Sequence, residues 1–112
     1  MVKLYVPARG DIVWLHFDPQ KGHEQKGHRP ALVLSPVEYN EKIGLMLCCP
    51  MTTQIKGYPF EVLVDGNPEN GAILVDQVKS MDWRVREAKK KGEISAATMI
   101  EVIEKIKAIL EG

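Results

Sequence analysis

A polar segment between two apolar runs holds most of the side chains in this chain that could do chemistry. Residues 22–30 read Gly-His-Glu-Gln-Lys-Gly-His-Arg-Pro and separate the strand-like runs 11–17 and 31–35. The segment supplies two imidazoles, a carboxylate, an amide, an ammonium and a guanidinium, and its two glycines let the backbone bend. Such a segment can surround an anion and transfer protons to and from it.

Cleavage of RNA without a metal would need only a few of these groups. A base must take the proton of the 2′-hydroxyl, an acid must protonate the leaving 5′-oxygen, and donors must stabilise charge on the phosphate oxygens. Arg29 suits the last task because its planar guanidinium matches a phosphate with two parallel hydrogen bonds. A surface ion pair is the alternative role for Arg29.

The histidines and acidic residues around Arg29 are candidates for the proton transfers and for substrate contacts. His23 and His28 could act as base and acid because imidazole titrates near neutral pH, although histidines in polar loops are often simply solvated. Glu24 could orient Arg29 or a histidine, and the Gln25 amide is a further candidate contact. His16 and Asp18 bracket one residue of the preceding strand, so we expect them on one face, shaping the site.

Two threonines after a later apolar run could contact the same phosphate. Thr52 and Thr53 precede Gln54 and Lys56, so a hydroxyl could donate to a phosphate oxygen while Lys56 adds positive charge. The alternative is that both are β-branched residues at the end of a strand.

A second basic group lies further along the chain. Basic side chains separated by an aromatic ring suit single-stranded nucleic acid, in which the charges follow the backbone and the ring stacks on a base. The alternative is a solvated basic face with the tryptophan in the core. The group comprises Lys79, Trp83, Arg84, Arg86 and the lysines at 89–91.

The familiar metal, nucleotide and nucleophile motifs are absent from the sequence. It contains no H-E-x-x-H, no spaced cysteine pair, no G-x-x-x-x-G-K-[ST] and no serine in a nucleophile elbow. Cys48 and Cys49 are adjacent in a strand-like run, so they should point to opposite faces as buried free thiols. We therefore expect neither a metal nor a cofactor.

Length and charge are consistent with one small domain that contacts nucleic acid locally. The 112 residues predict a single domain spanning 1–112, and 15 basic residues balance 15 acidic ones. The basic residues are unevenly placed, because six of them and only three acidic residues lie within 76–91. No signal peptide or long apolar run is visible, so we expect a cytoplasmic protein without membrane contact.

The pattern of apolar residues predicts a mainly β fold with one helix. Strands are expected at 12–17, 31–34, 45–49, 60–64 and 72–75, the last two paired as a hairpin, with a turn at 40–44 and no clear structure at 76–87. A helix should begin after Ser95, an N-cap residue followed by an apolar stripe. These elements suggest a small, curled, largely antiparallel barrel with the helix packed on it.

Taken together, these segments resemble the MazF-like (PemK-type) toxin endoribonucleases over nearly the whole chain. The resemblance is carried by residues 9–14, 22–31, 34–36, 50–62 and 76–84. It implies an SH3-like small barrel of the MazF/PemK/CcdB toxin type that forms a homodimer. It also implies that the essential arginine and threonine of the family fall on Arg29 and Thr52, with Glu24 as a further functional residue.

The activity implied by the resemblance is sequence-specific, metal-independent cleavage of single-stranded mRNA by the toxin of a type II toxin–antitoxin system. Such cleavage would leave a 2′,3′-cyclic phosphate and a 5′-hydroxyl and inhibit translation and growth, and a cognate antitoxin would cover the RNA groove. The alternatives are a non-enzymatic toxin of the same fold that binds and poisons DNA gyrase, and an inactive RNA-binding domain. Fold alone does not choose among them, but Arg29 and Thr52 acting together favour the nuclease.

Overall fold

Antiparallel strands and a long C-terminal helix make up most of the structure, a computed structural model that describes residues 4–16 and 28–112. The predictions for Asp18, His23, Glu24 and Gln25 therefore lie outside the described residues. The elements in chain order are β1 (Asp11–His16), β2 (His28–Val33), α1 (Val37–Ile43), β3 (Leu45–Thr52), β4 (Glu61–Leu63), the 3-10 turns η1 (Val64–Gly66) and η2 (Pro68–Asn70), β5 (Ala72–Leu74), β6 (Lys79–Asp82), β7 (Lys89–Glu93) and α2 (Ala96–Glu111).

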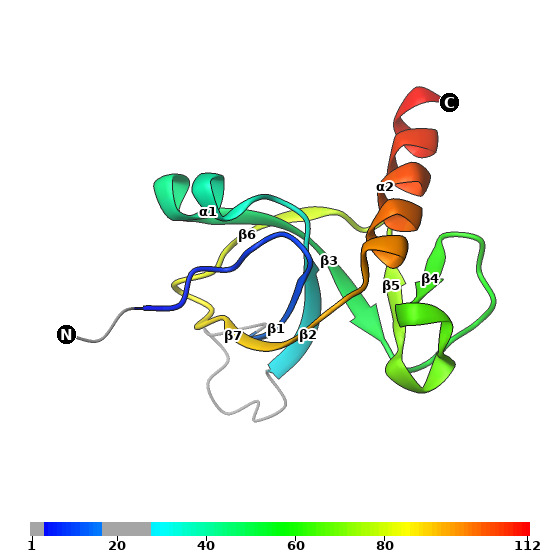
Figure 1. The fold of residues 1–112 in the computed structure, drawn as a ribbon, viewed down its shortest axis with the longest axis horizontal. Coiled ribbons are helices and arrows are strands. Elements are labelled where there is room, and N and C mark those ends of the chain that lie inside the picture. Colours follow the sequence, from blue (N-terminus) through cyan, green and yellow to red (C-terminus); the bar gives the residue numbers. More distant parts are fainter. Residues whose placement is uncertain (1–3, 17–27) are drawn as a thin grey trace.

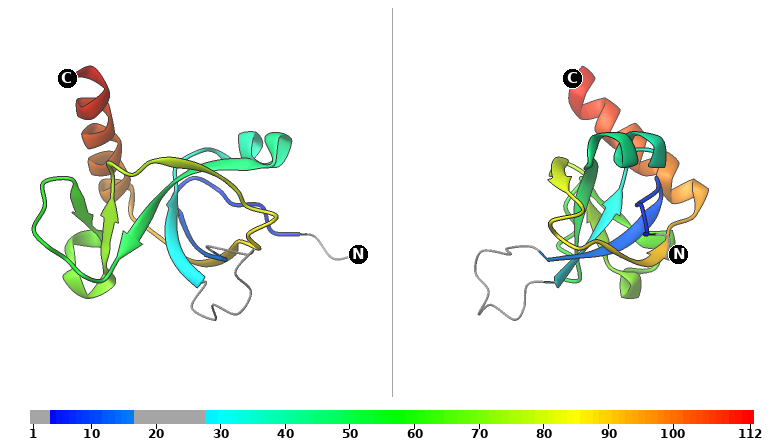
Figure 2. Two further views of the ribbon diagram at one scale, coloured as in Figure 1. Left: turned by 180° about the vertical axis from the view of Figure 1, so that it is seen from behind. Right: turned by 90° about the vertical axis from the view of Figure 1, so that its left-hand side faces the viewer.

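The strands form one curled antiparallel sheet. Their order is β4-β5-β3-β2-β1-β7, and β6 pairs with β3 beside this path. The strands β7, β1, β2, β3 and β6 curve around a common interior, while β4, β5 and α2 lie to one side of it (Figure 1). The view from behind shows the same ring (Figure 2, left). The predicted mainly β fold with a C-terminal helix is confirmed, but no pairing joins β4 to β7 in the described part, so the sheet is not closed.

Two hydrophobic cores lie on opposite faces of the curled sheet. We call the first the ring core; it contains Val13, Leu15, Ala31, Val33, Met46, Cys48, Met81 and Trp83. We call the second the helix core; it contains Ile12, Leu32, Leu34, Cys49, Val62, Val64, Ile73 and Val75 together with Met99 and Val102 of α2. Neighbouring residues of a strand enter different cores, as the period of a β-strand requires. Cys48 and Cys49 are accordingly buried on opposite faces, both as free thiols, which confirms the prediction.

The helix predicted after Ser95 is confirmed, and its N-terminus is tied to η1. The Ser95 hydroxyl accepts a hydrogen bond from the Thr98 N–H at 3.2 Å. The Asp65 carboxylate accepts from the Ser95 N–H and from the Thr98 hydroxyl, each at 3.0 Å. These hydrogen bonds from Ser95 and Thr98 lower the pKa of Asp65.

The segment at 40–44 is not the predicted turn, because α1 covers Val37–Ile43 and ends at Gly44. Gly44 has φ of 83°, a left-handed conformation that glycine adopts without strain. The helix is held by the buried Asn40, which accepts from the Ser35 hydroxyl and donates to the carbonyl oxygens of Pro7 and Ser35. Because Pro7 is far from Asn40 in the sequence, the residues around 40–44 alone did not indicate that a helix is held there.

The third strand also differs from its prediction, because β3 continues through Pro50 to Thr52. Pro50 is the last residue of β3 that pairs with β2, opposite Ala31, and the next two residues pair with β5 instead. A proline is tolerated where a strand changes partner. Among the described residues, no helix combines the length and apolar composition needed to cross a membrane.

Candidate functional site

Arg29 and Thr52 lie at the same end of two neighbouring strands. The last pair between β2 and β3 is Ala31 opposite Pro50. Arg29 is two residues before Ala31, and Thr52 is two residues after Pro50. The side chains of Arg29 and Thr52 therefore point to the same face of the sheet as those of Ala31 and Pro50. That face is the ring-core face, since Val33 and Cys48, opposite each other on the same strands, are both ring-core residues.

Two more cations belong to this end of the ring. Lys79 pairs with Cys48 across β6 and β3 and shares a face with Met81 of the ring core. Arg86 donates from its Nη1 to the His16 carbonyl oxygen at 3.1 Å, and its own carbonyl accepts from the His16 N–H. Burial raises the pKa of the Cys48 thiol to about 11, while the positive charges of Lys79 and Arg86 act in the opposite direction. We call Arg29, Lys79 and Arg86 the cationic end of the ring.

A pocket of about 430 Å³ is lined in part by Thr52. Thr52 Oγ1 accepts a hydrogen bond from the Gln54 N–H at 3.0 Å. A hydroxyl has one hydrogen to donate besides its acceptor sites, so Thr52 can still donate to a phosphate oxygen. The pocket, which we call the Thr52 pocket, is lined by Thr52, Gln54, Lys56, Tyr58, Glu61, Leu74, Asp76 and Gln77.

The loop that forms one wall of the Thr52 pocket is held by Glu61. Its carboxylate accepts hydrogen bonds from three successive backbone N–H groups, those of Lys56, Gly57 and Tyr58, at 3.0–3.2 Å. The Tyr58 hydroxyl donates to Asp76 at 2.6 Å, which raises the pKa of Tyr58. The loop thereby fixes the position of the Lys56 backbone beside Thr52.

Sequence reasoning missed Tyr58, Glu61, Asp76 and Gln77 as members of this pocket. A signal was present, because strands were expected at 60–64 and 72–75 and were interpreted as a hairpin. The structure confirms that hairpin, with β4 antiparallel to β5 and Val75 donating to the Phe60 carbonyl. Pairing these strands places residue 58 near residue 76.

Several predicted contact residues lie elsewhere in the structure. Trp83 is only 6% exposed in the ring core, and its indole N–H donates to the Asn40 carbonyl at 2.9 Å. The indole of Trp83 therefore exposes no face on which a base could stack, and the predicted alternative, a tryptophan in the core, is confirmed. Arg84 donates to the Glu41 carbonyl near the start of β3, the end opposite Thr52. The structure thus does not bring Trp83 and Arg84 to the site.

The two neighbouring threonines face different hollows. Thr53 lines a separate hollow of about 340 Å³ together with Met51 and Lys91. Lys56, in contrast, lines the Thr52 pocket as the sequence suggested. Of the two threonines, only Thr52 therefore shares a pocket with Lys56.

His16 and His28 pair with each other instead of joining Arg29. They are opposite in the β1–β2 register, with ring centroids 4.1 Å apart, and His16 Nε2 lies 3.5 Å from the Glu87 carboxylate. His28 alternates with Arg29 along β2, so the two side chains point to opposite faces. In residues 4–16 and 28–112 no group of three histidine, cysteine or acidic side chains is arranged to hold a metal ion.

Comparison with known proteins places this geometry in a family. Residues 8–110 match the family described as PemK-like, MazF-like toxin of type II toxin–antitoxin system. The chain is 53% identical over 110 residues to the endoribonuclease toxin MazF of Escherichia coli K12, covering 98% of this chain and 99% of that protein. It is 37% identical to the endoribonuclease toxin ChpB of the same organism, covering 99% of this chain and all of that protein.

Solved structures agree with the sequence comparison. MazF in a MazE–MazF crystal structure from Deinococcus radiodurans superposes with a TM-score of 0.83 at 44% identity, covering 96% of this chain and 97% of that one. MazF alone from the same organism gives a TM-score of 0.81 at 48% identity, covering 97% of this chain and 100% of that one. The chain belongs to the PemK-like, MazF-like family of type II toxin–antitoxin toxins.

Proposed function

We propose that this chain is a sequence-specific, metal-independent endoribonuclease that cuts single-stranded mRNA and thereby inhibits translation and growth. Its family and its relatives named as endoribonuclease toxins make it an endoribonuclease toxin of a type II toxin–antitoxin system. The observation that carries the assignment of the site is that Arg29 and Thr52 continue one face of adjacent strands at one end of the sheet. A toxin that only binds DNA gyrase would have no use for this combination.

In the proposed reaction, the guanidinium of Arg29 and the hydroxyl of Thr52 hold the scissile phosphate. Both donors stabilise the negative charge that builds on the phosphorus oxygens as the 2′-hydroxyl attacks. The bond to the 5′-oxygen then breaks, which leaves a 2′,3′-cyclic phosphate and a 5′-hydroxyl. Glu24 and Arg29 are the residues we assign to the proton transfers.

The neighbouring residues supply charge and polar contacts for the rest of the RNA. Lys79 and Arg86 adjoin Arg29 at the cationic end, so they can neutralise phosphates on either side of the cleaved one. In the Thr52 pocket, Gln77 and the Tyr58–Asp76 pair present donors and acceptors to the edge of a base. Lys56 adds positive charge to the same pocket.

Substitutions at positions 29 and 52 test the assignment. Arg29→Ala and Thr52→Ala should each lower kcat/KM by roughly a hundred- to a thousandfold, as is typical of a lost donor to transition-state charge. Thr52→Ser should restore most of the activity because it keeps the hydroxyl. Lys42→Ala, a cation of α1 at the other end of β3, should cut like the parent, as should Thr53→Ala. Full activity in a folded Arg29→Ala variant would contradict the site.

A second experiment tests the type of reaction. Cleavage sites are first mapped on a long RNA by primer extension, and a DNA oligonucleotide is then made with one ribonucleotide at the mapped position. The chain should cut only at that ribonucleotide, produce a cyclic phosphate and remain active in EDTA. Cleavage of the all-DNA strand, or dependence on added divalent metal, would contradict the mechanism.

We also propose that the chain forms a homodimer through an apolar groove. The groove has a volume of about 550 Å³ and runs between β3, α1 and α2, where Leu47, Val78 and Leu110 expose apolar side chains. A second copy would bury these side chains. The groove is lined by Arg9, Leu34, Ser35, Pro36, Tyr39, Leu47, Val78, Ile103, Ile106 and Leu110.

The proposed protein partner is a cognate antitoxin that binds over the RNA groove. MazF from Deinococcus radiodurans was solved in complex with MazE, and this chain shares its fold and 44% of its residues. An acidic segment of the antitoxin would compete with RNA for the cationic end, because both are anionic there. We place the chain in the cytoplasm, where it meets mRNA, without membrane contact.

A further inference from the structure

Trp14 lies on the face of β1 that points away from Arg29. Along this strand Val13 and Leu15 are fully buried in the ring core, whereas Trp14 alternates with them and is 36% exposed. Its partners across the sheet are Pro30 of β2 and Lys89 of β7. The reaction proposed above gives this exposed ring no role.

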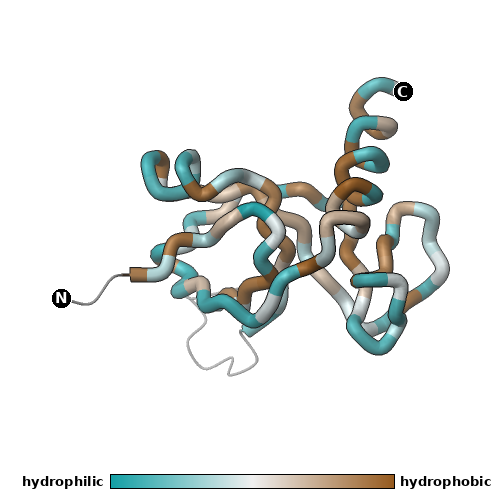
Figure 3. The backbone as a smooth tube through the Cα atoms, in the orientation of Figure 1, coloured by the Kyte–Doolittle hydropathy of each residue, from teal (hydrophilic) through white to brown (hydrophobic). Residues whose placement is uncertain are grey.

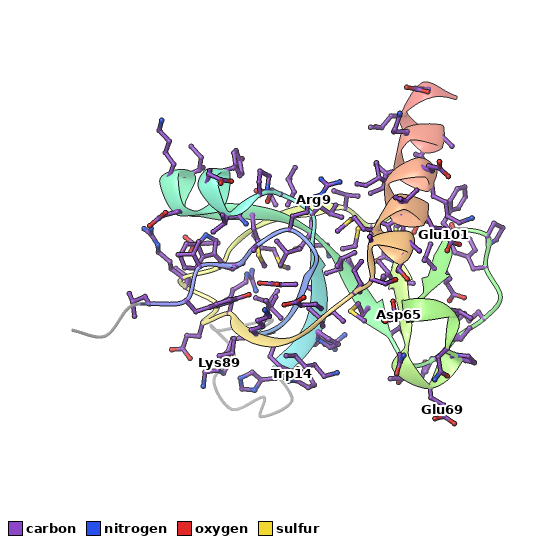
Figure 4. All side chains as sticks on the ribbon, in the orientation of Figure 1. Arg9, Trp14, Asp65, Glu69, Lys89 and Glu101 are labelled. Atoms are coloured by element: carbon purple, nitrogen blue, oxygen red, sulfur yellow. The ribbon has the colours of Figure 1, made fainter. Side chains whose placement is uncertain are left out.

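The surroundings of Trp14 are aromatic and positively charged. The Lys91 ammonium lies 4.7 Å from the centroid of the Trp14 ring, and the His16–His28 pair, whose rings are in contact but tilted by 49°, follows on the same face. A shallow hollow of about 320 Å³ is lined by Trp14, His28 and Lys89. Trp14 and Lys89 lie near each other at the outer side of the ring (Figure 4). We call this surface the outer strip; it consists of Trp14, His16, His28, Lys89 and Lys91.

The three lysines of β7 have different environments. Lys90 is bound to carboxylates, with its Nζ 2.6 Å from Glu93 and 3.6 Å from the buried Asp11. No carboxylate is paired with Lys89 or Lys91 among the described residues, and both are exposed. The segment is among the hydrophilic parts of the backbone (Figure 3). Alternation along the strand therefore separates one structural lysine from two that can meet an external anion.

We propose that the outer strip binds single-stranded RNA that flanks the cleavage site. Bases would stack on the indole and the two imidazoles, while Lys89 and Lys91 neutralise the adjoining phosphates, which is how proteins hold single strands with little sequence preference. The inference rests on the proposed cleavage of RNA. The strip reaches the same end of β1 and β2 as Arg29 but on the opposite face, so it contacts nucleotides beyond the scissile one.

The charge and the rings together select this ligand over a protein segment. Two lysines favour a polyanion, and an acidic peptide would satisfy them equally well. A row of aromatic rings in addition offers stacking surfaces that acidic side chains cannot use. A single strand of nucleic acid uses both features.

Binding can be measured with single-stranded oligothymidylate, which has no 2′-hydroxyl and therefore cannot be cut by the proposed reaction. The probe should quench Trp14 fluorescence in the parent chain. Trp14→Ala should weaken binding about tenfold, and Trp14→Phe should restore it because a ring remains. Lys89→Ala and Lys91→Ala should each lower the slope of log affinity against log salt by roughly 0.7, whereas Lys42→Ala should not.

Cleavage distinguishes failure of the strip from failure of the site. With folding intact, Trp14→Ala should reduce kcat/KM about tenfold for an RNA with single-stranded flanks and leave a minimal RNA around the cleavage site unaffected. Equal loss on both RNAs, or no loss on either, overturns the inference while Arg29→Ala still tests the site. Binding of a glutamate-rich peptide but not of oligothymidylate would assign the strip to a protein partner and also overturn it.

Discussion

At the residue scale, Glu61 holds the loop that forms one wall of the Thr52 pocket. Its carboxylate accepts from the N–H groups of Lys56, Gly57 and Tyr58. Gly57 has φ of 75°, so this turn depends both on glycine and on the carboxylate that bonds its N–H. A pocket wall held by one side chain can be loosened by one substitution.

Glu61→Ala should therefore raise KM more than it lowers kcat, because Arg29 stays in place while the wall that carries Lys56 loses its anchor. The free energy of unfolding should fall by about 1 kcal/mol, since hydrogen bonds to a charged acceptor are lost at a half-buried position. Steady-state kinetics and urea denaturation measure the two effects. Glu69→Ala, at an exposed carboxylate of η2, is the control, and an equal change in both variants would contradict this role.

The two cysteines provide a second test at this scale. Burial raises the pKa of Cys48 to about 11 and that of Cys49 to about 12, so little thiolate exists at neutral pH. Both thiols should react with a thiol reagent such as DTNB at pH 8 far more slowly in the native chain than in urea. Rapid reaction of either thiol in the folded chain would show that its strand is not packed as described.

Single residues also show what the sequence could reveal. Arg29, Thr52, Lys56, Lys79 and Arg86 were all selected from chemistry and spacing, and the structure brings them toward one end of the ring. Trp83 was a candidate for stacking on RNA because it lies between basic residues, with the core as the alternative, and its burial decides for the core. Trp14 was predicted only as a strand residue, because the alternation of side chains along a strand does not show which face of the sheet is exposed to solvent.

At the scale of elements, the start of α2 depends on a carboxylate from a distant turn. Asp65 has φ of 52° in η1 and accepts hydrogen bonds from Ser95 and Thr98. Because these bonds lower the pKa of Asp65, its stabilising effect is present above the ordinary value of 3.8 and is lost as pH falls through the lowered pKa. The helix should therefore loosen in acid.

Asp65→Asn should destabilise the chain at pH 7 and flatten the part of its stability profile below about pH 4. Asparagine tolerates the left-handed backbone conformation at this position, so the substitution tests charge and not strain. Urea unfolding followed by circular dichroism at several pH values measures the effect. Glu69→Gln, the neighbouring exposed carboxylate, should keep the acid dependence of the parent, and an unaltered profile in Asp65→Asn would refute the link.

The sequence predicted some helices and strands correctly and missed others. The helix after Ser95 and the strands 12–17 and 72–75 carried strong local patterns, and each corresponds to an element of the structure. The helix α1 was missed because its stability depends on the distant carbonyl of Pro7 that Asn40 binds. The strand β7 is made largely of exposed lysines and so shows no apolar alternation, and β6 (Lys79–Asp82) is too short to show a clear one.

At the scale of the whole molecule, the apolar groove should control the oligomeric state. The parent chain should sediment as a dimer, and Leu47→Asp should shift it toward a monomer because a charge would be buried against the second copy. Val85→Asp, at an exposed apolar position outside the groove, should remain dimeric. Analytical ultracentrifugation over a range of concentrations measures this, and a dimer that persists in Leu47→Asp would place the interface elsewhere.

The change of partner within β3 divides the proposed catalytic pair between two packing units. Arg29 is carried by the ring, whereas Thr52 pairs with Ala72 of the hairpin that packs under α2. A tilt of that hairpin would alter the separation of guanidinium and hydroxyl and would also shift the helix core, which joins Leu32 of the ring to Val62 and Ile73 of the hairpin. The geometry of the proposed catalytic pair is therefore coupled to the packing of the helix core, so substitutions deep in that core can change activity from a distance.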